Sequence, residues 1–226
     1  MERARLPFAS GWYTAGTHPD LWEGDGTYSL IPETALPPID LDRFDGSFSW
    51  LPPLPQGDDP LDFESRAQSI ANLERASLEA AKRRFSIPSA FTRFMTTPEL
   101  HRRVPTCTAC YLDVSKGLIH GPAEGGGHLL RFMNDQQTVL VWYLYLQPGG
   151  GHCVLVGIPE WRDDAQGDTL EDAIDVHEFR VCGPTFESFL FRFWIENAIW
   201  YALHNGRPLT PEQVAYVTHA RTARPR

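Results

Sequence analysis

Residues 128–146 read HLLRFMNDQQTVLVWYLYL. Two runs rich in aromatic and aliphatic residues flank Asn134-Asp135-Gln136, whose side chains favour turns. This pattern predicts two antiparallel strands joined by a hairpin, over residues 128–133 and 138–146. Three further stretches have the same strand character, so the sequence predicts an antiparallel sheet of about five to six strands. These stretches are residues 106–114, 152–158 and 177–182.

Helical patterns lie on both sides of this strand region. Before it, apolar residues recur at helical spacing over residues 61–85, and shorter helices are predicted over 90–95 and from Thr97-Pro98. After it, residues 185–203 are apolar on most faces, which predicts a buried helix. A last helix is expected from Thr210, with Pro211 in its first turn and Gln213 completing a capping box. Helices, strands and again helices give an α+β fold.

The first 60 residues differ from the rest of the chain. They hold nine of the 19 prolines, which disfavours long helices and central strands there. They also hold Trp12, Trp22 and Trp50, whereas disordered segments are poor in aromatic residues. We therefore expect a Pro-rich irregular N-terminal arm over residues 1–60, lying on an α+β domain over residues 61–226. The alternative is a tail that binds a partner.

Composition and charge limit the classes of function. The chain has 226 residues, 42% of them hydrophobic, and a formal net charge of −9. An acidic chain is poorly suited to nucleic acid, which is bound through Lys and Arg patches. No run reaches the roughly 18 to 20 apolar residues that a membrane span needs. The start has no apolar leader, so we expect a cytoplasmic protein with reduced thiols. No cofactor is predicted, and the oligomeric state stays open.

Cys107 and Cys110 form a Cys-x-x-Cys pair. Two thiolates at this spacing can ligate zinc, and His128 and His152 are the candidates to complete such a site. The two histidines stand on separate predicted strands, and residues three apart on a strand face opposite sides. We therefore interpret the cysteines as small, largely buried residues. A metal-binding or redox protein, or a small enzyme built on this pair, is the alternative.

An acidic run lies between the last two predicted strands. Its spacing does not fit a calcium-binding EF-hand loop. It is interpreted as a solvated loop or as a docking patch for a basic protein, with a metal site as the third alternative. As a docking patch, its contact residues would be Asp163, Asp164, Asp168, Glu171, Asp172 and Asp175.

Two further features have structural interpretations. Gly-Gly-Gly-His occurs twice, ending at His128 and His152, and the predicted strands that follow favour loop connections over phosphate-binding loops. Arg192 and Glu196 lie four apart within the apolar helix, so we expect them to be buried and paired. The chain holds none of the common hydrolase, metalloprotease or kinase motifs, and we expect a protein without catalytic residues.

Two stretches resemble the bacterial SMI1/KNR4-like (SUKH) proteins. One is 129–146, within the predicted hairpin, and the other is FESFLFRFWIEN at residues 186–197. The segment IPSAF at residues 87–91 is similar to the proline-containing segment that precedes the strands in that family. The resemblance covers roughly residues 61–203, and the arm lies outside it.

The resemblance implies an α+β binding scaffold. Many bacterial members are immunity proteins that bind and neutralise a toxin, often a nuclease, as in toxin–antitoxin pairs. The family has no catalytic residues to transfer. We therefore expect a non-enzymatic module that binds another protein, such as a basic toxin. A subunit that joins a larger assembly through its arm is a further alternative.

Overall fold

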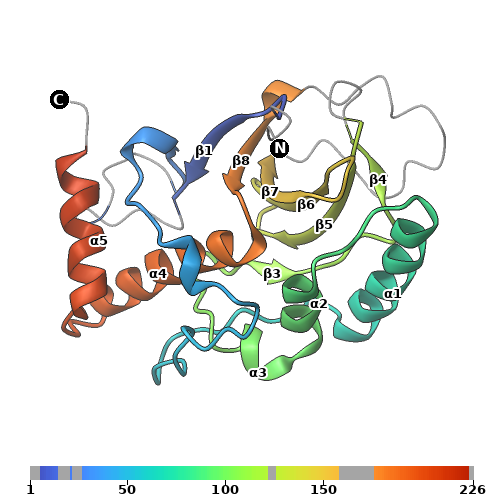
Figure 1. Ribbon diagram of the computed structural model, residues 1–226. Coiled ribbons are helices and arrows are strands. Elements are labelled where there is room, and N and C mark those ends of the chain that lie inside the picture. The colour runs from blue at the N-terminus through green and yellow to red at the C-terminus, as the bar shows by residue number, and fades with distance from the viewer. Residues whose placement is uncertain (1–5, 15–20, 22–26, 122–125, 158–175, 224–226) are drawn as a thin grey trace.

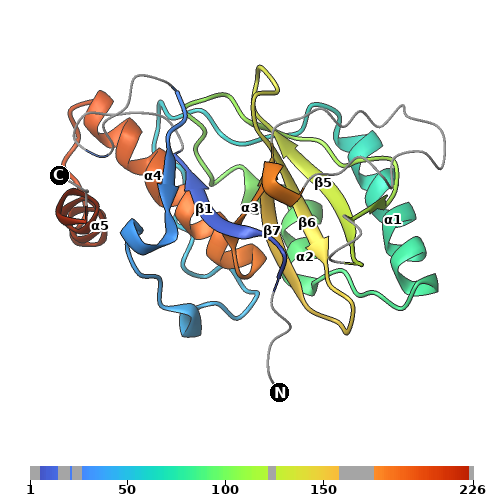
Figure 2. The same ribbon diagram turned by 90° about the horizontal axis from the view of Figure 1, so that it is seen from above.

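The computed structural model describes residues 6–14, 21, 27–121, 126–157 and 176–223. Within these residues eight strands form one mixed sheet, and helices cover one of its faces (Figures 1 and 2). The order across the sheet is β2-β1-β8-β7-β6-β5-β3, with β4 pairing to the same edge of β5 as β3. The strands are β1 (Ala9–Tyr13), β2 (Leu30–Pro32), β3 (Tyr111–Leu112), β4 (Ile119–His120), β5 (His128–Asn134), β6 (Val141–Leu146), β7 (His152–Gly157) and β8 (Phe179–Gly183).

The central hairpin forms where the sequence predicts it. β5 and β6 pair antiparallel, with Leu130 opposite Leu144. Asp135 begins the turn between them, and its side chain accepts hydrogen bonds from the backbone N–H groups of Val139 and Leu140. A carboxylate that satisfies two turn donors explains why the polar residues after β5 end the strand.

The sheet differs from the prediction in strand number and in direction. β1, β2 and β4 were not predicted, and the first predicted strand is reduced to the two residues of β3. β1 pairs parallel to β8, with Ala9 opposite Arg180, so the sheet is mixed rather than antiparallel. This pairing joins segments at the two ends of the chain, and local sequence patterns carry no signal for it.

The helices follow the predicted order. They are α1 (Arg66–Lys82), α2 (Ser89–Thr96), α3 (Pro98–His101), α4 (Phe186–His204) and α5 (Pro211–Thr222), with single 3-10 turns η1 (Glu33–Ala35), η2 (Leu41–Arg43) and η3 (Val176–Glu178). The capping box of Thr210 and Gln213 is present at the start of α5.

The predicted start of the first helix at residue 61 is wrong. The backbone N–H groups of Leu61 and Glu64 donate to the carbonyl oxygens of Val104 and Leu112. Residues 61–64 therefore pair with the chain after α3, and α1 begins only at Arg66.

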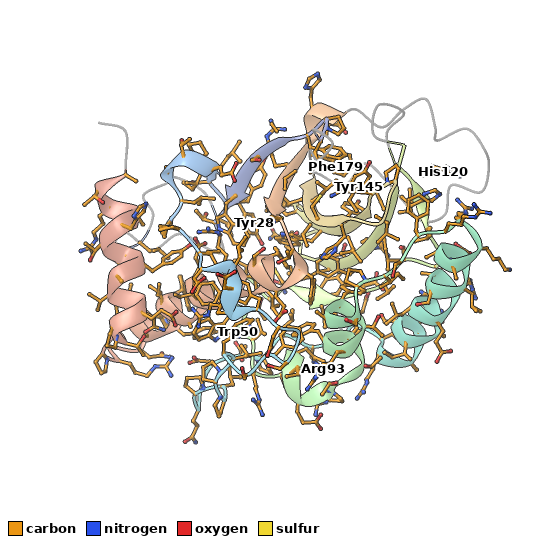
Figure 3. The ribbon with its side chains drawn as sticks, viewed as in Figure 1. Tyr28, Trp50, Arg93, His120, Tyr145 and Phe179 are labelled. Atoms are coloured by element: carbon orange, nitrogen blue, oxygen red, sulfur yellow. The ribbon has the colours of Figure 1, made fainter. Side chains whose placement is uncertain are left out.

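The two faces of the sheet have separate apolar clusters. On the helical face, Phe132 and Trp142 pack against Phe186, Phe189 and Phe193 of α4. On the opposite face a smaller cluster gathers around Tyr143, Tyr145 and Phe179, two of which are labelled in Figure 3. Both faces of β6 are therefore buried, which matches its uninterrupted apolar sequence.

Residues from the first 60 contribute to the main core. Trp12, on β1, is 1% exposed and contacts Phe189, while Phe48 packs on Phe94 of α2. Trp50 lies against Phe191 and Trp194 of α4. Trp22 lies outside the described residues. The remainder of the Pro-rich segment that is described runs over α4 as irregular chain with two 3-10 turns.

None of the helices among the described residues is both long and apolar enough to span a lipid bilayer.

Candidate functional site: a groove beside strand β8

The largest groove lies where β1 separates from β8. The two strands pair only at Ala9–Arg180 and Ser10–Val181, after which β1 turns to pair with β2. The separation leaves a groove of about 1070 Å³ that continues to the first turns of α4. Its apolar lining comes from the chain ends of the sheet and from the Pro-rich segment, and includes Leu6, Phe8, Leu36, Pro37, Pro38, Ile39, Leu41, Val181 and Pro184.

Arg192 of α4 forms part of the groove lining and is only 7% exposed. Its guanidinium donates to the hydroxyl of Tyr216, on α5, and to the carbonyl oxygen of Pro37, both at 2.9 Å. It also lies over the rings of Trp12 and Tyr216, at 5.9 and 5.8 Å from their centroids. A cation over an aromatic face is attracted by the ring quadrupole, so four contacts hold this side chain in place.

Glu196 completes the same network one helical turn later. Its two carboxylate oxygens accept hydrogen bonds from the indole of Trp12 and the hydroxyl of Tyr216, both at 2.8 Å. Arg192 and Glu196 are buried, as predicted, but the hydroxyl of Tyr216 bridges them instead of a direct ion pair. The network therefore ties β1, the Pro-rich segment and α5 to one face of α4.

The other titratable groups of the groove are held in neutral forms. Burial raises the pKa of the Cys153 thiol to about 12 and that of Cys182 well above its ordinary value. Burial also lowers the pKa of His152, whose Nε2 accepts the backbone N–H of Phe186 at the start of α4. These groups are poor general acids, bases or nucleophiles at neutral pH, and the groove offers apolar contact and neutral hydrogen-bonding groups instead.

A smaller pocket of about 420 Å³ adjoins the groove and shares Leu41, His152 and Thr185 with it. Glu187 lies in its wall and accepts hydrogen bonds from the Gly46 backbone and the Trp50 indole. The chain along this side carries the exposed carboxylates Glu33, Asp40 and Asp42, and Asp45 lines the pocket. The rim of the two hollows is therefore acidic.

Cys107 and Cys110 lie elsewhere, beside a third pocket of about 440 Å³. Cys110 is buried, and its backbone N–H donates to the hydroxyl of Thr106. Burial raises the pKa of Cys110 to about 11 and that of Cys107 further. All four cysteines belong to the described part of the chain and are free thiols. Protonated thiols are weak metal ligands and weak nucleophiles, which disfavours the redox and metal alternatives.

The structure separates the four residues considered for a metal site. Cys110 precedes β3, which pairs with the Asn134 end of β5, whereas His128 begins β5, about 20 Å away at 3.4 Å per residue. His128 and His152 share a row of the sheet, but Leu146 lies between them, so they are about 10 Å apart. Among the residues that the structure describes, no three metal-ligating side chains form a group.

The candidate docking residues Asp163, Asp164, Asp168, Glu171, Asp172 and Asp175 lie outside the described residues. The groove itself was not predicted, although the burial of Arg192 and Glu196 within an apolar helix was a usable signal for the network beneath it. Both Gly-Gly-Gly-His histidines begin strands, as their interpretation as connections requires.

No protein-family model matches the chain, and no curated protein or solved structure is significantly similar to it.

Proposed function

We propose that this chain is a non-enzymatic protein-binding module that binds and neutralises a partner protein such as a toxin, in the manner of bacterial SUKH immunity proteins. The observation that carries the proposal is the groove beside β8. It is large and mainly apolar in its lining residues, and its buried arginine is held by Tyr216 and Pro37. Such a surface can bind a protein segment without supplying groups for catalysis.

Charge supports a basic partner. The chain carries a net charge of −9, and exposed carboxylates lie along one side of the groove. Opposite charge on a partner speeds the encounter and orients it, while apolar anchors in the groove supply affinity. The resemblance of residues 129–146 and 186–197 to SUKH proteins is consistent with this use of the fold.

The test uses Leu41, which is 44% exposed and borders both hollows. Tagged wild-type protein and Leu41→Lys are used to capture partners from the source cells at low and moderate salt, with mass spectrometry as the readout. The captured partner is then purified, and its affinity for each variant and its own activity in the complex are measured. We expect Leu41→Lys to weaken binding about tenfold or more, because it removes an anchor and adds a positive charge.

Leu78→Lys is the matched control, since Leu78 is an apolar residue on α1, 66% exposed and not part of the groove lining. It should bind the partner as the wild type does. Equal binding by Leu41→Lys would contradict the groove as the contact. A partner whose activity is unchanged in the complex, or no stoichiometric partner in either salt, would contradict neutralisation.

A further inference from the structure

A second cluster of functional side chains lies at the opposite end of the sheet, on β4 and β5. His120 and His128 are directly opposite each other in the antiparallel pairing of these strands. Their rings lie 4.9 Å apart between centroids. His120 is exposed and is seen beside the end of α1 in Figure 3. His128 is buried against Phe85.

Close backbone contacts fix the distance between the two histidines. The residues next to them in the ladder are Gly121 and Gly127, and the N–H of Gly121 donates to the carbonyl oxygen of Gly127 at 2.8 Å. A Cβ atom at position 127 would lie 2.4 Å from the carbonyl oxygen of Leu146, so a larger residue cannot be accommodated without moving the strands. Rigid pairing of this kind positions two imidazoles before any ligand arrives.

Both imidazoles turn the same nitrogen toward one point. That point holds Nη1 of Arg83, the residue at the C-terminal end of α1, which is 2.5 Å from Nε2 of His128 and 3.4 Å from Nε2 of His120. A guanidinium has only donors, so the histidine nitrogens that face it act as acceptors. His128 then carries its proton on Nδ1. Burial, with Arg83 and His120 nearby, lowers the pKa of His128 to about 4.

We propose that His120 and His128 bind a divalent first-row transition metal ion, such as zinc or nickel, through their Nε2 atoms at the position that Arg83 occupies. Two neutral imidazole lone pairs that converge on a cationic nitrogen are arranged as a metal requires. Water would supply the remaining ligands. Arg83 is exposed, so its side chain can withdraw into solvent when the ion binds.

The carboxylate of Glu79 favours a cation here. It lies one turn before Arg83 on α1, accepts the backbone N–H of Leu118 and acts to raise the pKa of His128. The site is thus flanked by one acid, Glu79, and one base, Arg83. The ion and the arginine compete for the same place. That competition distinguishes this proposal from adsorption of metal to a surface histidine.

The experiment is calorimetric titration of the untagged full-length protein with zinc chloride and with nickel chloride at pH 7. One equivalent should bind to the wild type. His120→Gln should weaken binding about tenfold or more by removing one of two ligands. Arg83→Met should strengthen it by about tenfold, since a positive charge next to the site is removed. His204→Gln is the control, because His204 is exposed and stacks on Trp200 of α4.

Nitrogen-15 spectra of the histidine rings provide a second readout that does not depend on variants. Zinc should shift the Nε2 resonances of His120 and His128 together. Circular dichroism confirms that each variant is folded, and His120→Gln, at an exposed position, is the variant least exposed to a folding defect. The proposal fails if the wild type binds neither metal, if His120→Gln and His204→Gln behave alike, or if Arg83→Met binds more weakly than the wild type.

Discussion

Two arginines at opposite ends of one sheet are used in different ways. Arg192 is buried, and its contacts come from β1, the Pro-rich segment and α5. Arg83 is exposed and is hydrogen-bonded to two imidazoles of neighbouring strands. The first joins distant parts of the chain and cannot move without disturbing them. The second lies at an edge and can be exchanged. The comparison indicates that burial with partners from several segments, and not the residue type, makes an arginine structural.

Deletion of residues 1–60 removes one side of the Arg192 network altogether. It takes away Trp12, Phe48 and Leu51 from the core and leaves Glu196 without its indole donor. Loss of a buried Trp or Phe side chain costs about 3–5 kcal/mol, and a domain of this size has only about 5–15 kcal/mol in all. We expect the truncated chain to be unfolded by circular dichroism and in thermal melts. A cooperative melt of the truncated chain would show that the segment is dispensable.

Glu196→Ala tests the same network with a single change. It leaves Tyr216 and the Trp12 indole without their acceptor and the charge of Arg192 buried without its bridged carboxylate. We expect a loss of about 3–5 kcal/mol in the free energy of unfolding, measured with urea. Glu212→Ala breaks the ion pair with Arg43, whose side chains are 30% and 43% exposed, and should cost no more than about 1 kcal/mol. Equal losses in the two variants would contradict the distinction.

Acid should act on the other end of the sheet through His128. Its pKa in the folded state is about 4, below its ordinary value of 6.5, so the unfolded chain takes up the proton first as pH falls. Stability is therefore complete above about pH 6.5 and declines as pH falls toward 4, by about 1.4 kcal/mol for each unit of pKa difference. The lowered pKa values of His101 and His152 act in the same direction.

The share of His128 is read from its ring protons in an NMR titration. In wild-type protein they should titrate near pH 4. In Arg83→Met the midpoint should rise, because a neighbouring positive charge that lowers it is gone. A wild-type midpoint near 6.5 would contradict the burial of this imidazole.

Arg83→Met should have the smallest effect on folding. The side chain is exposed, and its hydrogen bonds to His120 and His128 are made at the surface edge of the sheet. We expect the free energy of unfolding at pH 7 to change by less than about 0.5 kcal/mol, measured with urea. A loss above 2 kcal/mol would place Arg83 in the same structural class as Arg192.

The part of the fold that local patterns control was predictable. The alternation of residue types around Asn134-Asp135-Gln136 predicts the β5–β6 hairpin, and Thr210 with Gln213 predicts the start of α5. Long-range pairing was not. Proline counting treated residues 1–60 as irregular, although no proline interrupts the chain between Pro7 and Pro19, where β1 forms.

The candidate sites were predictable in the same unequal way. A charged pair within an apolar helix showed that Arg192 and Glu196 are buried, but their partners are residues 12, 37 and 216, which the helix does not specify. His120 gave no signal, because β4 is two residues long and has no periodicity to read. The groove depends on where two strands diverge, which only the assembled sheet defines.

The parallel pairing of β1 with β8 also has a consequence for synthesis. Ala9 leaves the ribosome early, whereas Arg180, its partner in the sheet, is added 171 residues later. At about 5–20 residues per second, this interval lasts roughly 10–35 s. For that time Trp12 lacks the carboxylate of Glu196, and the apolar residues near it have no core to enter. Prolines and acidic side chains in the same segment oppose aggregation during this wait, since neither favours strand pairing between nascent chains.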